Sequence, residues 1–185
     1  MKKKLILLVN VTIVTLSLSA QQVKNQDKTI ETKMDAFASK TGTIIKFIDY
    51  NLPGLKSFLT GSVDTRIRKF SGAGESKYFY QTEKTGQYSN TTASIEYSDL
   101  LEVIKALTTL KTQVDNDVAL NPDYLENKFV TSDGFEIGYY VSNGKTKWYL
   151  KLERYGSDNT IFINDVETLT TAFQGAKDKI EELKK

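Results

Sequence analysis

The sequence predicts an α+β fold: duplicated ββββα units form a largely antiparallel eight-stranded sheet, with two long helices packed on it and a short N-terminal helix. Apolar residues alternate with polar ones in eight short segments, as in half-buried strands. In two longer segments they recur every three or four residues, as on one face of a helix. The second half of the chain also repeats the element order of the first.

The repeat extends to individual residues. Residues 77–84 (KYFYQTEK) align with residues 147–154 (KWYLKLER), and Gly86 then falls on Gly156. Further on, the start and the apolar stripe of one long helical segment align with those of the other. We therefore expect internal repeats at about 43–120 and 124–185 within a single α+β domain spanning 43–185. The alternative is one irregular α+β domain without a repeat.

The first 20 residues have the organisation of a secretory signal peptide. Lys2, Lys3 and Lys4 precede a mostly apolar run, residues 5–18, and the small residue Ala20 stands at the expected cleavage point. The run is short for a membrane span, for which about 20 apolar residues are needed. We expect export to the periplasm or the exterior of a Gram-negative bacterium, with an uncleaved anchor as the alternative. No Cys follows the run, which excludes a lipid-anchored lipoprotein.

Composition excludes several classes of enzyme. The 185 residues include no Cys and no His, which leaves no Ser-His-Asp triad, Cys-His dyad or His- or Cys-ligated metal. Removal of the signal peptide removes three Lys and leaves 22 basic against 23 acidic residues. A nearly neutral chain gives no indication of a nucleic-acid surface. Without disulfides, the hydrophobic core alone must stabilise the exported domain.

The first half contains one short helix, four strands and one long helix. Residues 21–42 are predicted to be a tether and a short helix from about Asp27 to Ser39. The strands are predicted at 43–50, 65–71, 77–84 and 92–97, and residues 51–54 (NLPG) are expected to end the first of them. The long helix follows, capped by Ser98 or by Asp99 with Glu102, and ends at residues 121–122 (NP). Its apolar stripe is Leu100, Val103, Leu107, Leu110, Val114 and Val118.

The second half contains four further strands and the last helix. The strands are predicted at 125–131, 135–142, 145–154 and 160–163. Asn164 or Asp165 is expected to cap the last helix. Its apolar stripe is Leu169, Phe173, Ala176, Ile180 and Leu183.

One hairpin can be placed in register. A two-residue Asn143-Gly144 turn pairs Ser142 with Lys145 and, further along, Tyr139 with Trp148. Apolar residues then share one face, and Glu136 meets Lys151 on the other. This predicts that the only tryptophan is a core residue.

The opposite face of this hairpin holds the candidate ligand-binding residues Phe129, Tyr140, Tyr149 and Tyr155. If Asp133-Gly134 also closes a two-residue turn, Phe129 and Tyr149 flank the bare backbone of Gly138. An exposed aromatic patch of this kind is typical of a shallow site for a sugar or a peptide. The alternative is a structural role, in which the aromatic rings shield Gly138 or are covered by another part of the chain.

Other motifs give no catalytic or metal-site prediction. The glycine-rich segment 71–76 (SGAGES) lacks the ending of a phosphate loop and is interpreted as a hairpin turn. Residues 115–117 (DND) lack the later ligands of a calcium loop. Glu83 and Glu153 occupy equivalent places in the two repeats, but nothing in the sequence brings them together as a glycosidase requires. We therefore expect no catalytic residue, no metal and no cofactor.

The chain resembles a group of exported proteins of Gram-negative bacteria. The resemblance lies in residues 17–21 (SLSAQ), 38–47 (ASKTGTIIKF), 133–135 (DGF) and 147–149 (KWY). It implies no known activity. The doubled sheet-and-helix order is also similar, by analogy only, to secreted protein inhibitors built from tandem sheet-and-helix repeats, and a shared fold does not establish a shared function.

The function predicted from the sequence is a non-catalytic binding or inhibitor module of the periplasm or cell exterior. The alternatives are a carrier domain for a glycan or lipid fragment and, least favoured, a carboxylate-based hydrolase. The expected partner is an envelope or extracellular protein or a glycan. No nucleic acid is expected as a partner, and no transmembrane segment is expected in the mature chain.

Overall fold

The structure is a computed structural model, and it describes residues 32–57, 61–87 and 89–185. The predicted signal peptide (1–20), residues 21–31 of the predicted tether and the first residues of the predicted short helix lie outside the described residues.

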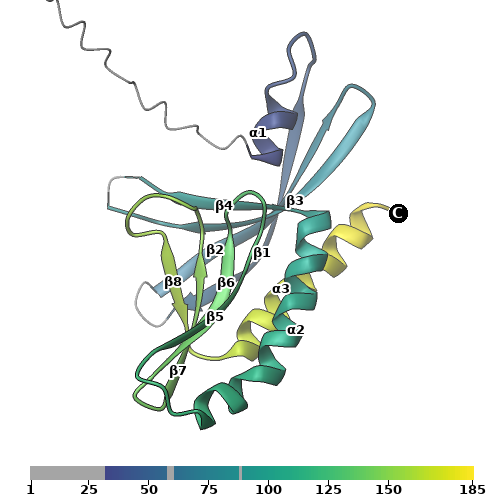
Figure 1. Cartoon of the computed structure of the whole chain (residues 1–185). Helices are drawn as coiled ribbons and strands as arrows, with labels where there is room; N and C mark the ends of the chain where they lie inside the picture. Colours follow the sequence, from purple (N-terminus) through teal and green to yellow (C-terminus); the bar gives the residue numbers. More distant parts are fainter. Residues whose placement is uncertain (1–31, 58–60, 88) are drawn as a thin grey trace, which may run out of the picture.

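The fold is α+β, with an eight-stranded antiparallel sheet and three helices, two of them long (Figure 1). The sheet order is β4-β3-β2-β1-β8-β7-β6-β5. The strands are β1 (Lys46–Ser57), β2 (Gly61–Gly72), β3 (Glu75–Lys84), β4 (Thr91–Glu96), β5 (Leu125–Val130), β6 (Glu136–Ser142), β7 (Lys145–Lys151) and β8 (Thr160–Ile163). The helices are α1 (Lys33–Ala38), α2 (Tyr97–Ala119) and α3 (Val166–Leu183).

The two long helices pack on one face of the sheet and enclose the main core (Figure 1). The predicted stripes supply their contacts: four residues of each stripe are buried, and the remaining stripe residues pack against the core more loosely. Phe173 of α3 lies between the halves of the sheet. Its ring centroid is 5.3 Å from that of Tyr80 on β3 and 6.1 Å from that of Phe135, just before β6.

The predicted cap of α3 is confirmed and that of α2 is wrong. Asp165 accepts a hydrogen bond from the Thr168 amide at 2.7 Å and so satisfies one of the free N–H groups of the first turn of α3. By contrast, α2 begins two residues earlier than Asp99. Its N-cap is Glu96, whose side chain makes no capping hydrogen bond, because the Glu96 carboxylate is bonded to Lys77 at 2.9 Å instead.

The first strand does not end at residues 51–54, as the sequence suggested, but continues to Ser57. Leu52 pairs with Thr65 and Leu55 pairs with Val63, so Pro53 and Gly54 form a β-bulge. The Thr65 hydroxyl donates to the Pro53 carbonyl at 3.0 Å. A bulge lets the strand carry a proline without ending.

The hairpin of β6 and β7 has the predicted register. Ser142 pairs with Lys145, Tyr139 with Trp148, and Glu136 with Lys151. Asn143 and Gly144 have φ values of 51° and 70°, as the two-residue turn requires. Trp148 is buried in the core, with its ring centroid 4.8 Å from that of Tyr139.

The register predicted for β5 against β6 is wrong by one residue, and this moves Phe129 to the other face. The connection contains five residues, 131–135, and is closed by hydrogen bonds between Thr131 and Phe135. Phe129 therefore pairs with Ile137 and packs against the main core, while Lys128 lies opposite Gly138. Because side chains alternate along a strand, the longer turn places every side chain of β5 on the opposite face of the sheet from the one predicted.

The short helix α1 covers part of the opposite face of the sheet. Its first turn has a capping box between Thr32 and Asp35. Phe37 packs edge-on against Phe70 with centroids 6.2 Å apart, and Phe70 packs edge-on against Phe79 at 5.7 Å. These three rings form a second, smaller core.

Gly138 provides a test of the β5–β6 register. A Cβ at this position would lie 2.4 Å from the Asn127 carbonyl oxygen and 2.7 Å from the Lys128 Cβ. We expect Gly138→Ala to lower the free energy of unfolding by about 2 kcal/mol, because β5 must move away. Urea denaturation measures this, with Gly175→Ala as the control, since a Cβ there meets no atom within 4 Å. Equal effects of the two changes would contradict the register.

Candidate functional site

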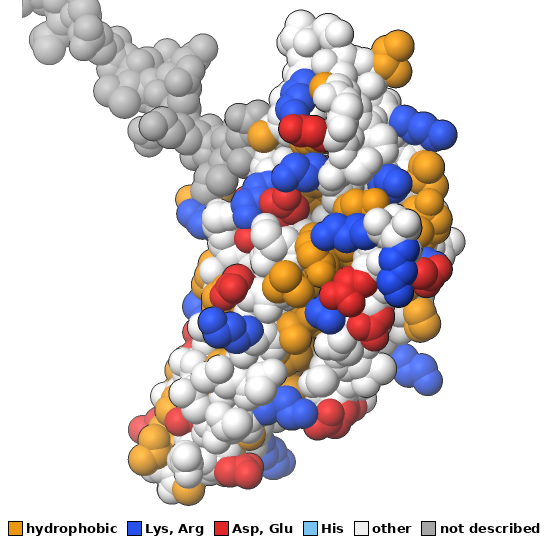
Figure 2. Space-filling view, turned by 90° about the vertical axis from the view of Figure 1, so that its right-hand side faces the viewer, with side chains coloured by type: hydrophobic (Ala, Val, Ile, Leu, Met, Phe, Trp, Pro, Cys, Tyr) orange, Lys and Arg blue, Asp and Glu red, His pale blue; other side chains and the backbone are white. Residues whose placement is uncertain are grey.

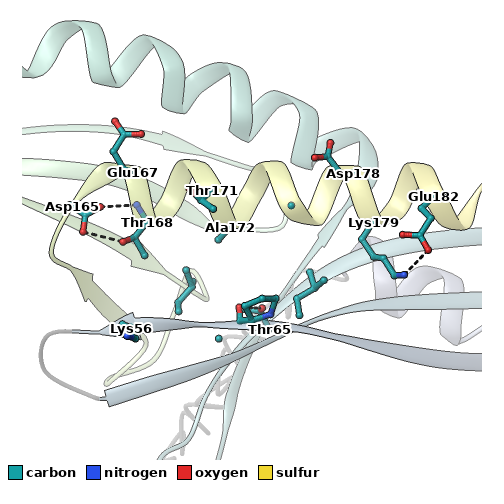
Figure 3. A pocket seen from close by; sticks show the side chains of 15 residues that line it. Lys56, Thr65, Asp165, Glu167, Thr168, Thr171, Ala172, Asp178, Lys179 and Glu182 are labelled. Carbon is teal, nitrogen blue, oxygen red and sulfur yellow. Dashed lines mark hydrogen bonds and ion pairs between the residues drawn. The ribbon is translucent and has the colours of Figure 1, made fainter.

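A large cavity in the described part of the chain lies between β1 and α3. β1 pairs with β2 along its length, whereas the one pair between β1 and β8 among the described residues is Ser57 opposite Ile163. The helix α3 runs alongside β1 and leaves a groove of about 800 Å³ between strand and helix (Figure 3). We call this the β1–α3 groove.

The sheet side of the groove is largely apolar. Leu52, Pro53 and Leu55 line it from β1, together with Thr65 from β2. The bulge presents the proline ring and the bare Gly54 backbone to the groove. The one hydroxyl on this side, that of Thr65, is already bonded to the Pro53 carbonyl.

The helix side of the groove is made of small residues. Thr168, Thr171, Ala172 and Gly175 recur every three or four residues and therefore share one face of α3 (Figure 3). Gly175 is in the interior of the helix, where glycine costs about 1 kcal/mol relative to alanine. Open space lies where its side chain would be.

Charged residues stand at the rim of the groove, and most are engaged with other parts of the protein. Asp165 caps α3, Glu167 is 2.7 Å from the Lys111 ammonium of α2, and Lys179 is 2.9 Å from Glu182. On the side of the molecule that carries the helices, Figure 2 shows hydrophobic side chains along the middle with charged side chains on both sides.

Two buried hydroxyls lie close to the groove. Among the described residues, the Tyr80 and Thr82 hydroxyls are fully buried without a hydrogen-bond partner. Thr82 pairs across the sheet with Thr65, which lines the groove, and the Tyr80 hydroxyl lies near both threonines. Burial raises the pKa of Tyr80 to about 12.

The structure brings together two of the four predicted ligand-binding residues, Tyr140 and Tyr149, on the face of the sheet opposite α2 and α3. Tyr149 is buried and its hydroxyl donates to Glu126; burial and this bond raise the pKa of Tyr149. The half-buried Tyr140 ring stacks on Tyr124 at 5.9 Å and meets Phe162 edge-on at 6.3 Å.

The other two predicted residues lie elsewhere. Phe129 is on the helix side of the sheet, as described above. Tyr155 is 71 % exposed, beyond the end of β7, and lines a second cavity of about 420 Å³ between α1, β4 and the loop after β7. Two carboxylates of this cavity are engaged in local structure: Asp133 accepts from the Lys33 amide, and Asp35 belongs to the capping box of α1.

The carboxylates singled out in the sequence have structural partners. Glu83 is 2.7 Å from Arg66, and this hydrogen bond lowers the pKa of Glu83. Glu153 is exposed and lies past the end of β7, which stops at Lys151 and not at residue 154 as predicted. Asp117 accepts a 2.6 Å hydrogen bond from the Tyr139 hydroxyl. Within residues 32–57, 61–87 and 89–185, no three Asp or Glu side chains gather as metal ligands would.

The sequence analysis missed the groove-lining residues. Residues 53–54 match the pattern of a strand end, and Gly175 lies inside a helical pattern that predicts no site. A glycine in the middle of an amphipathic helix, on the same side as Ala172, was the available signal.

No protein-family model, no curated protein and no solved structure matches this chain. Among the described residues, no helix is long and apolar enough to cross a bilayer.

A structural role for Tyr149 predicts a large effect on stability. We expect Tyr149→Ala to lower the free energy of unfolding by about 3 kcal/mol, since it empties a buried site and removes the hydrogen bond to Glu126. Tyr140→Ala, at a half-buried ring on the same face, should cost less. Unchanged stability of Tyr149→Ala, with loss of binding to an envelope glycan, would contradict the structural role.

The ion pairs of Glu136 should contribute to the free energy of unfolding at neutral pH and not in acid. Burial alone would raise the pKa of Glu136, but Lys128 at 2.8 Å and Lys151 at 3.4 Å outweigh it, and the pKa lies below its usual value. This stabilisation is present above the unfolded-state pKa of about 4.3 and is lost as the pH falls through the lower, folded-state pKa. We expect Glu136→Gln to be less stable than the wild type at pH 7. Urea denaturation should show the difference narrowing below about pH 4, and a constant difference would contradict this account.

Proposed function

We propose that this protein is a non-catalytic binding protein that carries a small amphipathic molecule, such as a lipid fragment, with its apolar part in the β1–α3 groove. The observation that carries the proposal is a groove of about 800 Å³ with an apolar lining, between the sheet and a helix. Small-molecule sites have volumes of roughly 300–1,000 Å³ and are lined mainly by apolar groups with a few polar ones. Thr65 and the rim charges supply the polar groups here.

The bulge favours a small molecule over a peptide strand. The free edge of β1 could in principle accept a further strand. Pro53, however, has no N–H to donate, and the bulge breaks the regular spacing that a ladder needs. An acyl chain needs no backbone hydrogen bonds, because it binds through apolar contacts alone.

A binding role also fits the state of the titratable groups. Asp165 caps a helix, Glu167 and Glu182 form ion pairs, and Asp178 accepts a hydrogen bond from Gln174 at 2.8 Å. No Ser and no Tyr is among the described residues that line the groove. A carboxylate-based hydrolase would need two carboxyl groups facing each other across the substrate.

Export and duplication are part of the proposal. The signal-like N-terminus supports a location in the periplasm or outside the cell. Two ββββα units are supported by the sheet order, in which the run β4-β3-β2-β1 is followed by β8-β7-β6-β5. Each run of four strands in the sequence is also followed by a long helix.

A second candidate function is protein inhibition through the outer face of β5 to β7. It is favoured by one observation: Tyr124 is 60 % exposed and is held in place by stacking on Tyr140. A rigid exposed tyrosine is a typical anchor in protein interfaces.

The groove is tested by filling it. We expect Gly175→Leu to place a side chain in the open space of the groove and to lower the affinity for a dansylated fatty acid at least tenfold. Gly175→Ala should bind nearly as the wild type does, while both changes raise the free energy of unfolding by up to about 1 kcal/mol through helix propensity. Dansyl emission and urea denaturation measure the two effects.

A leucine placed one position away gives the matched control. Gln174 is exposed on α3 and does not line the groove, so Gln174→Leu should retain wild-type affinity. Lysophosphatidylcholine, added as a competitor, should displace the probe if the apolar chain decides binding. Full binding by Gly175→Leu, or no binding by the wild type, would rule out the groove as the site.

A further inference from the structure

The end of the sheet formed by β1, β2 and β3 projects beyond the two long helices (Figure 1). It consists of residues 39–49, from the end of α1 into β1, and residues 68–78, from β2 through the turn into β3. We call it the projecting end. Three apolar side chains are exposed on it: Ile44 is 94 % exposed, Phe47 58 % and Ile48 36 %.

Packed residues lie beneath these exposed apolar side chains. Phe47 contacts Phe70 with ring centroids 6.0 Å apart, and Phe70 belongs to the small core beneath α1. Ile45, next to Ile44, packs against the same core. Ile44 and Phe47 therefore lie beside a packed support. The Arg68 guanidinium lies over the Phe47 ring, 4.7 Å from its centroid, and leaves more than half of Phe47 exposed.

The projecting end is positively charged, although the mature chain is almost neutral. It holds five cationic side chains, Lys40, Lys46, Arg68, Lys69 and Lys77, and two carboxylates, Asp49 and Glu75. Lys77 is paired with Glu96, which lies outside the projecting end.

Both carboxylates are neutralised. Asp49 is 2.6 Å from Arg68, and Glu75 is 3.3 Å from Lys40. Among the described residues, Lys46 and Lys69 have no carboxylate partner; the Lys69 ammonium lies over the Tyr78 ring. In Figure 2, hydrophobic and cationic side chains lie side by side along the upper right margin.

We propose that the projecting end docks on an anionic phospholipid surface. Ile44 and Phe47 would enter the boundary between head groups and acyl chains. Lys46 and Lys69, which share the other face of the strands with Ile48, would contact the phosphates at the same end of the sheet. Exposed apolar groups flanked by lysines are the combination that holds proteins at membrane interfaces, where apolar burial and attraction to anionic lipids act together. The residues are different from those of the β1–α3 groove, so this inference does not depend on the proposed function.

Vesicle co-sedimentation tests the proposal. The wild type should bind vesicles of phosphatidylcholine and phosphatidylglycerol (3:1) at 20 mM NaCl, and at least tenfold more weakly in 500 mM NaCl or with phosphatidylcholine alone. Ile44→Ser with Phe47→Ser, and separately Lys46→Glu with Lys69→Glu, should each lower the partition coefficient about tenfold or more.

The controls change the same residue types elsewhere. Leu120 is 70 % exposed just after α2, whose last turn is at the bottom of Figure 1, and Lys145 is exposed at the β6–β7 turn. Leu120→Ser and Lys145→Glu should bind as the wild type does. Circular dichroism checks that each variant is folded. If the Ile44→Ser, Phe47→Ser double variant does not fold, Ile44→Ser alone takes its place, because Ile44 is almost fully exposed.

Three outcomes would overturn the proposal: no binding of the wild type to anionic vesicles, equal binding to neutral ones, or equal loss in the control variants. Pull-down of a protein partner by the projecting end, without vesicle binding, would assign the surface to a protein instead. Gly175→Leu should bind vesicles normally, which separates a failure at the projecting end from a failure of the groove.

Discussion

Among the described residues, one pair joins the two halves of the sheet, and the β1–α3 groove depends on how the halves meet there. Ser57 at the end of β1 lies opposite Ile163 at the end of β8, and the Ser57 hydroxyl donates to the Phe162 carbonyl at 3.1 Å. Because β8 has only four residues and α3 is capped two residues later, the chain leaves the sheet at once and crosses beside β1. From Leu52 to Lys56, β1 therefore lies beside a helix, and the β1–α3 groove lies between them.

The two halves of the sheet protect their outer faces by different means. In the first half, α1 covers the face with the cluster of Phe37, Phe70 and Phe79. In the second half, the side chains on that face cover it by bonding to one another: Tyr149 donates to Glu126, and Glu136 lies between two lysines. The surfaces left open are those where this packing stops, at Tyr124 and at the projecting end of the sheet.

Local sequence signals predicted the elements that depend on local physics. The Asn143-Gly144 turn fixed the β6–β7 register and with it the burial of Trp148, because a two-residue turn leaves one pairing only. The Asp133-Gly134 pair carries the same kind of signal, yet Thr131 extended that turn by bonding to Phe135. That one-residue difference moved Phe129 across the sheet and removed it from the candidate site.

The sequence alone determined the fold class, the positions of both long helices and their buried stripes, since these follow from apolar periodicity within each segment. It also determined the composition that leaves no His or Cys chemistry. Tertiary structure decided which surfaces could bind anything. The groove exists because β1 and α3, more than 100 residues apart, lie side by side, with Pro53 and Gly175 turned toward the same space. No local pattern in either segment encodes that approach, because it depends on how the two halves of the sheet meet.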